Sequence, residues 1–163
     1  MKIKKAQQSV GMSFGMIFSI ILIIAFVAFA FKAITFFLDF GSSSQLIQFY
    51  EDFQDKIDDA WTTASLEEIY EFDLPSQITH VCFANFSAPL TGTQELSSQI
   101  KSYDYDSNIF LIPQKKASTP MREIEHLDIE SITRIQNPFC VENPGAITIV
   151  KELGSQKVLI EEL

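Results

Sequence analysis

Residues 6–31 read AQQSVGMSFGMIFSIILIIAFVAFAF, a run of 26 residues without a formal charge. From Met16 to Phe31 the only polar side chain is that of Ser19. An α-helix rises about 1.5 Å per residue, so about 20 such residues cross a hydrocarbon core of about 30 Å. The stretch therefore predicts a membrane-spanning helix, and this helix decides how the rest of the chain is organised.

A cleaved secretory signal is the alternative interpretation of this stretch. Such a signal has an apolar core of about 7 to 15 residues, followed by a small-x-small cleavage site. Here the apolar run is longer, and AFAF at residues 28–31 leads directly into KAITFFLDF at residues 32–40. We therefore expect the apolar segment to remain part of the protein.

Charge is distributed unevenly along the chain. Four of the 12 bases, Lys2, Lys4, Lys5 and Lys32, precede the first acid, Asp39, so the remaining 8 bases accompany all 21 acids. The positive-inside rule places the N-terminus in the cytoplasm and the acidic remainder outside the cell membrane. An acidic domain repels nucleic acid, so a nucleic-acid partner is excluded, and membrane lipid is the partner that the helix predicts.

Two features depend on that outer location. An even number of cysteines, here Cys82 and Cys140, predicts one disulfide in an extracytoplasmic domain, with two separate buried thiols as the alternative. Asn85-Phe86-Ser87 is an N-x-S sequon, which makes Asn85 a candidate for carrying an N-glycan.

A second helix is predicted after GSSS at residues 41–44, four small residues that can bend a helix or cap a new one. Residues 44–61, SQLIQFYEDFQDKIDDAW, place apolar side chains at the i, i+3, i+4 and i+7 spacing of an amphipathic helix. The apolar stripe consists of Leu46, Phe49, Tyr50, Phe53, Ile57, Ala60 and Trp61. Acids fill the opposite side, so we expect the stripe to pack on a sheet.

Strands are predicted where the period changes to two residues. Residues 78–84 alternate within DLPSQITHVCFANF, and NIFLIP at residues 108–113 is a short run closed by proline. Residues 124–132 alternate less regularly, and we interpret them as a strand. The runs 146–151 and 157–161 flank Gly154-Ser155, which predicts a terminal hairpin.

The expected fold class is α+β. It comprises a basic leader at residues 1–6, a transmembrane or assembly helix at 7–40, and an extracytoplasmic head at 41–163. The head is expected to pack its helix on one small antiparallel sheet of four or five strands, with exposed loops at 90–107 and 136–145.

Candidate catalytic and metal-binding groups are few. His80 and Cys82 share one face of a predicted strand, but without a CxxC or HxxxH pair a histidine beside a disulfide is favoured. Asp104, Asp106 and Asn108 have calcium-loop spacing, yet they lack the glycine and glutamate of an EF-hand. No phosphate-binding loop or nucleophile turn is present. We therefore predict no enzyme, no cofactor and no metal site.

Gly11, Gly15 and Ser19 fall at i, i+4 and i+8 in the apolar segment. Such a small-residue stripe lets membrane helices approach closely, which predicts self-association or packing with other membrane helices. The alternative is that glycine and serine are simply frequent in membrane helices.

Residues 1–20, MKIKKAQQSVGMSFGMIFSI, resemble the start of archaeal type IV pilin-like proteins, which carry a class III signal peptide. That signal has a short basic leader, a small residue before the cut, then Q-x-S and a long apolar helix. The resemblance implies cleavage between Ala6 and Gln7 by a prepilin peptidase, with Gln7-Gln8-Ser9 following the cut. It also implies a subunit whose helix stays in the membrane or packs with its copies in a filament.

Two functions therefore remain open. The first is a structural, pilin-like subunit that displays an acidic head at the cell surface or in an extracellular filament. The second is a single-pass, membrane-anchored binding module or accessory subunit that does not polymerise, with loops 90–107 and 136–145 meeting a partner. The second accounts better for Gly11, a position where the pilin family often has glutamate.

Overall fold

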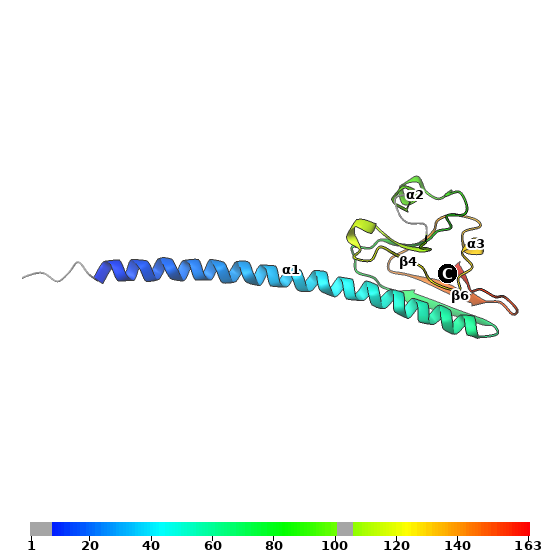
Figure 1. Cartoon of the computed structure of the whole chain (residues 1–163), viewed down its shortest axis with the longest axis horizontal. Helices are drawn as coiled ribbons and strands as arrows, with labels where there is room; N and C mark the ends of the chain where they lie inside the picture. Colours follow the sequence, from blue (N-terminus) through cyan, green and yellow to red (C-terminus); the bar gives the residue numbers. More distant parts are fainter. Residues whose placement is uncertain (1–7, 101–105) are drawn as a thin grey trace, which may run out of the picture. The chain divides into compact units, whose positions relative to one another are not determined.

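The computed structural model describes residues 8–100 and 106–163, with side chains at 15–37, 41–100 and 106–163. The chain forms two compact units, residues 1–41 and 42–163. The first unit is helical, and the second contains the end of the same helix together with all the strands that the structure describes (Figure 1). The second unit is called the head below.

One helix, α1, runs from Gln8 to Thr62 without interruption. No new helix starts at residues 41–44, so the predicted second helix is the C-terminal part of α1. Serine has a helix propensity only slightly below that of ordinary residues, and one glycine costs about 1 kcal/mol. Neither removes a backbone hydrogen bond as proline does, so strong helix formers on both sides carry the helix through.

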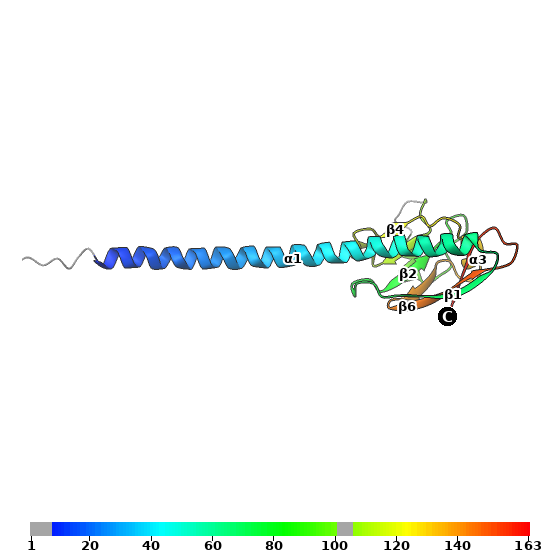
Figure 2. The same ribbon diagram turned by 90° about the horizontal axis from the view of Figure 1, so that it is seen from below.

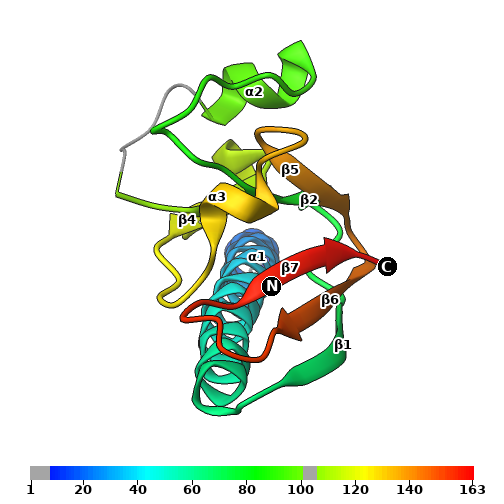
Figure 3. The same cartoon turned by 90° about the vertical axis from the view of Figure 1, so that its right-hand side faces the viewer.

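The apolar stripe of this C-terminal part forms the centre of the head. Leu46, Phe49, Tyr50, Phe53, Ile57 and Ala60 are all buried, as predicted. They share one core cluster with residues of β1, β2, β3, β6 and β7. Figure 2 and Figure 3 show these strands gathered along one side of that part of α1.

Trp61 is the exception to the predicted stripe. Its side chain is 42% exposed, and its indole stacks on the His126 ring with centroids 3.9 Å apart and planes 5° apart. The helix ends at Thr62, and at this last stripe position the partners are His126 and Gln156 of the β6–β7 turn.

The head contains two antiparallel sheets instead of the single predicted sheet. The three-stranded sheet has the order β1-β6-β7, formed by Leu66–Phe72, Gly145–Lys151 and Leu159–Glu162. The four-stranded sheet has the order β4-β3-β2-β5, formed by Met121–Arg122, Ile109–Ile112, His80–Phe83 and Phe139–Glu142. The additional strands are β1, β4 and β5. Both sheets contribute to the core around α1, the four-stranded sheet mainly through β2 and β3.

The predicted strands have mixed outcomes. β2, β3 and the β6–β7 hairpin are confirmed, and Gly154 has the positive φ of 83° that its turn needs. The strand predicted at 124–132 is wrong, because His126 has a positive φ of 66° and Asp128 caps a helix there. That helix, α3, spans Ile129–Ile132, and the Asp128 carboxylate accepts from the Ser131 N–H at 3.2 Å.

Both predicted loops also contain regular structure. Residues 90–107 include α2, Gln94–Ile100, and residues 136–145 include β5. A short 3-10 helix, η1, spans Gln114–Lys116 after β3.

Three asparagine side chains form hydrogen bonds with the backbone of other segments of the head. Asn137, 2% exposed, accepts from the Asn85 N–H at 3.0 Å and donates to the Asn85 carbonyl at 2.7 Å. Asn108 bonds in the same reciprocal way with the backbone of Ile124, and Asn143 with that of Leu74. These side-chain amides hold loop segments in place where the backbone hydrogen bonds between strands have ended.

Burial raises the pKa values of two tyrosines in the core. The Tyr50 hydroxyl donates to the Thr119 carbonyl at 3.2 Å, and burial raises the pKa of Tyr50 well above its usual range, although Arg122 lowers it in part. Burial raises the pKa of Tyr70 to about 12, helped by the charge of Asp52. Both phenols therefore remain neutral at physiological pH.

Candidate membrane segment and head surface

The described residues of α1 that belong to the first unit present apolar side chains on all sides of the helix. From Met16 to Phe37 the large apolar residues are between 41% and 73% exposed. The most apolar 18-residue window has a mean hydropathy of 2.7, and none of it is buried within this chain. The helix is therefore long and apolar enough to cross a membrane, as judged by length and composition.

The small-residue stripe is part of this surface. The Ser19 hydroxyl donates to the Gly15 carbonyl at 2.9 Å, so its polar group is satisfied within the helix. A side chain added at Gly15 would meet no atom of the described chain within 4 Å. Gly11 lies in α1, whereas the processing residues Ala6 and Gln7 lie outside the described residues. Nothing within the described chain requires glycine at position 15.

Cys82 and Cys140 form a disulfide, which confirms the predicted pairing. They are direct cross-strand partners in β2 and β5, with Cα atoms 4.0 Å apart. Cys140 falls within residues 136–145, which are predicted as a loop, but it lies in β5. The bond therefore joins neighbouring strands of the four-stranded sheet, and Cys82 is fully buried.

Asn85 follows β2 directly. Its side-chain oxygen accepts from the Ser87 N–H at 2.9 Å, which forms an Asx turn across the sequon. The Asn85 side chain is half-buried and Ser87 is exposed. N-glycosylation of Asn85 remains a prediction.

The described residues of the two candidate ligand sets have other partners or are not grouped together. The Cys82 sulfur is bonded to Cys140, and His80 Nδ1 lies 2.9 Å from the Thr79 hydroxyl. Both polar atoms of the Asn108 amide are bound to Ile124, and Asp104 lies outside the described residues. Among the residues that the structure describes, no three His, Cys, Asp or Glu side chains are grouped to hold a metal.

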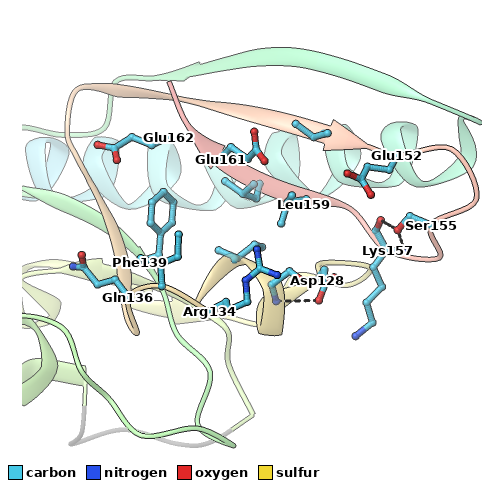
Figure 4. Close-up of a pocket in the computed structure, with 15 residues that line it drawn as sticks. Asp128, Arg134, Gln136, Phe139, Glu152, Ser155, Lys157, Leu159, Glu161 and Glu162 are labelled. Atoms are coloured by element: carbon cyan, nitrogen blue, oxygen red, sulfur yellow. Dashed lines mark hydrogen bonds between the residues drawn. The ribbon is translucent and has the colours of Figure 1, made fainter.

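A groove of about 490 Å³ lies between α3, the segment after it and the β6–β7 hairpin. Figure 4 shows side chains entering it from both sides, with Arg134 on the α3 side and Glu152 and Glu161 on the hairpin. Ile132, Phe139 and Leu159 supply apolar lining. Sequence patterns did not predict this groove, because its walls are about 20 residues apart in the chain and meet through tertiary contacts such as the bridge between Leu127 and Val158.

Comparison with protein-family models, with curated proteins and with solved structures finds no match to this chain. The fold defines the class of protein. It is an α+β protein with one N-terminal helix long and apolar enough to span a membrane, joined to a disulfide-bonded head of antiparallel sheets.

Proposed function

We propose that this protein is a structural subunit of a type IV pilin-like assembly at the cell surface, anchored and assembled through its N-terminal helix. The single observation that carries the proposal is the continuity of α1. Its first part is apolar and unburied, and its last part is the core element of a β-rich head. One helix thus offers an apolar surface for association and also supplies the core element of the displayed domain.

The charge distribution supports an orientation for this subunit. The basic N-terminus would lie in the cytoplasm before cleavage between Ala6 and Gln7, and the acidic head would lie outside. The disulfide agrees with an oxidising location for the head.

A membrane-anchored binding module or accessory subunit is the second candidate. The groove beside α3 favours it, since residues 136 and 139 of the predicted partner loop line that groove. In this case the helix serves only as an anchor, and the small-residue stripe has no role in association.

Self-association through Gly15 distinguishes the two candidates. We expect Gly15→Leu to weaken self-association of the full chain in lipid vesicles by about tenfold, equivalent to about 1.4 kcal/mol, because a large side chain separates the helix backbones. Energy transfer between donor-labelled and acceptor-labelled chains, measured against lipid dilution, gives the affinity.

Ala28→Leu is the matched control for this experiment. Ala28 is exposed and, at 3.6 residues per turn, lies on the far side of the helix from Gly15. It receives the same side chain, so its transfer curve should stay at the wild-type level. If Gly15→Leu behaves like Ala28→Leu, the helix does not associate through this stripe and the anchored-module candidate is favoured.

A further inference from the structure

A second pocket of the head, of about 660 Å³, lies where α1 ends. It is called the Lys151 pocket below, and its walls come from three places. These are the end of α1 with the two residues after it (Trp61, Thr63 and Ala64), His126, and the β6–β7 turn with the strand end before it. The last wall consists of Lys151, Leu153, Gly154, Ser155, Gln156 and Lys157. Two lysines and a histidine line it and no acid does, in a chain with a net charge of −9.

Lys151 is the buried cation of this pocket. It is 5% exposed and follows Ile147 and Ile149 on the buried face of β6. Its ammonium makes no hydrogen bond or ion pair with any residue that the structure describes. The stem of this side chain is buried, but the ammonium at its end still reaches solvent, so an anion that enters the pocket can pair with it.

The end of α1 does not fill this role, although carbonyl groups of a last helical turn can attract a lysine. The Asp59 carbonyl already accepts from the hydroxyls of Thr62 and Thr63, at 3.0 Å and 2.8 Å. The Ala60 carbonyl accepts from the Thr63 N–H at 3.2 Å. These acceptors therefore have their own donors.

The remaining wall of the pocket is held rigidly. The Trp61 indole N–H donates to the Gln156 carbonyl at 3.0 Å, and its ring stacks on His126. The Ser155 hydroxyl donates to the Lys157 carbonyl at 2.7 Å. The donors to a ligand are therefore the two lysines, because His126 Nε2 already faces Asp58 and Glu125. Trp61 and Leu153 supply apolar surface.

We propose that the Lys151 pocket binds the carboxylate of a small organic monoanion. The carboxylate would pair with the Lys151 ammonium, and the group that carries it would lie against Trp61 and Leu153. A monoanion is favoured over a dianion because Asp58 and Glu125 lie 3.9 Å and 3.8 Å from His126 Nε2 and repel additional negative charge. This proposal does not depend on whether the helix assembles.

Intrinsic fluorescence tests the proposal directly, because Trp61 is the only tryptophan. The full chain in a nonionic detergent is titrated at constant ionic strength with N-acetyl-leucine and with glucuronate. N-acetyl-leucinamide and methyl glucoside serve as uncharged counterparts. We expect a saturable change with a carboxylate and none with its counterpart, and weaker binding of inorganic phosphate.

Lys151→Met removes the charge and keeps most of the side-chain volume, so we expect it to weaken carboxylate binding at least tenfold. Lys115→Met changes an exposed lysine of η1 that does not line the pocket, and it should leave binding unchanged. Near-ultraviolet circular dichroism reports whether Lys151→Met folds. If it does not fold, Lys157→Met, at the rim, replaces it with an expected loss of about threefold.

Each outcome decides the proposal. Binding of both carboxylates supports it, and binding of only one also identifies the source as a peptide-like or a sugar acid. Equal binding of a carboxylate and its uncharged counterpart, no saturable change, or tighter binding of phosphate would overturn it. Equal affinities of the Lys151→Met and Lys115→Met proteins would also overturn it.

Discussion

Phe53→Ala is expected to lower the free energy of unfolding of the head by about 3 to 5 kcal/mol. The Phe53 side chain is 0% exposed, and its ring lies 5.3 Å from that of Tyr70 and 6.1 Å from that of Phe83. Its removal leaves a cavity between α1 and both sheets. Because a domain of this size is stable by about 5 to 15 kcal/mol, the loss is a large fraction of the total.

Denaturation of the full chain by guanidinium, in a nonionic detergent, measures this effect. The near-ultraviolet circular dichroism and the fluorescence of Trp61 follow the head, whereas far-ultraviolet signals also report the apolar part of α1. Ile47→Ala is the matched control, since Ile47 lies on the same helix and is 46% exposed. It should change stability by only about 0.5 kcal/mol. Equal effects of the two changes would contradict the position of the core.

Removing the disulfide is expected to destabilise the head by about 4 kcal/mol. Cys82 and Cys140 are 58 residues apart, and a loop of that length constrains the unfolded chain by roughly this amount in the chain-entropy model. β5 is the edge strand of the four-stranded sheet and is bonded to β2 through this disulfide. Loss of the disulfide should therefore also make β5 more accessible to solvent.

The comparison uses the Cys82→Ala, Cys140→Ala double variant and wild-type protein with and without reductant. The guanidinium midpoint should fall in the double variant and in reduced wild type by similar amounts, and reductant should leave the double variant unchanged. An unaltered midpoint in the double variant would show that strand pairing and packing alone hold β2 and β5 together.

The features that could be predicted from the sequence are those with long, regular patterns. The apolar run from Met16 and the stripe from Leu46 to Ala60 each repeat over several helical turns. The terminal hairpin could also be predicted, because two apolar strand-like runs flank a turn that contains a glycine. Trp61 continues the helical spacing, but no pattern shows that its side chain is exposed.

Strand β1 was missed for a physical reason. Its half-buried face carries Leu66, Glu68 and Tyr70, so an acid interrupts the apolar alternation. Glu68 is accommodated there because Lys56 of α1 lies 2.7 Å away, and this hydrogen bond raises the pKa of Lys56. Such a partner, 12 residues earlier and on another element, leaves no local pattern.

The candidate sites of the head could not be predicted from local sequence patterns either. The Lys151 pocket combines the end of α1, His126 and the β6–β7 turn, which are far apart in the chain and come together only in the folded head. Asn137 resembles any polar loop residue in the sequence, yet its amide holds the segment that contains Asn85. By contrast, Gly15 and Ser19 could be identified from spacing alone, because helical periodicity places them on one face.

The intact mass of the protein extracted from the membranes of its native cells tests the pilin-like proposal most directly. The proposal predicts a mature chain that lacks residues 1–6 and begins at Gln7, with the apolar helix retained and the Cys82–Cys140 bond intact. Mass in excess of this value that an amidase specific for N-glycans removes would assign a glycan to Asn85. A chain that still begins at Met1 would contradict the proposal and leave an anchored module.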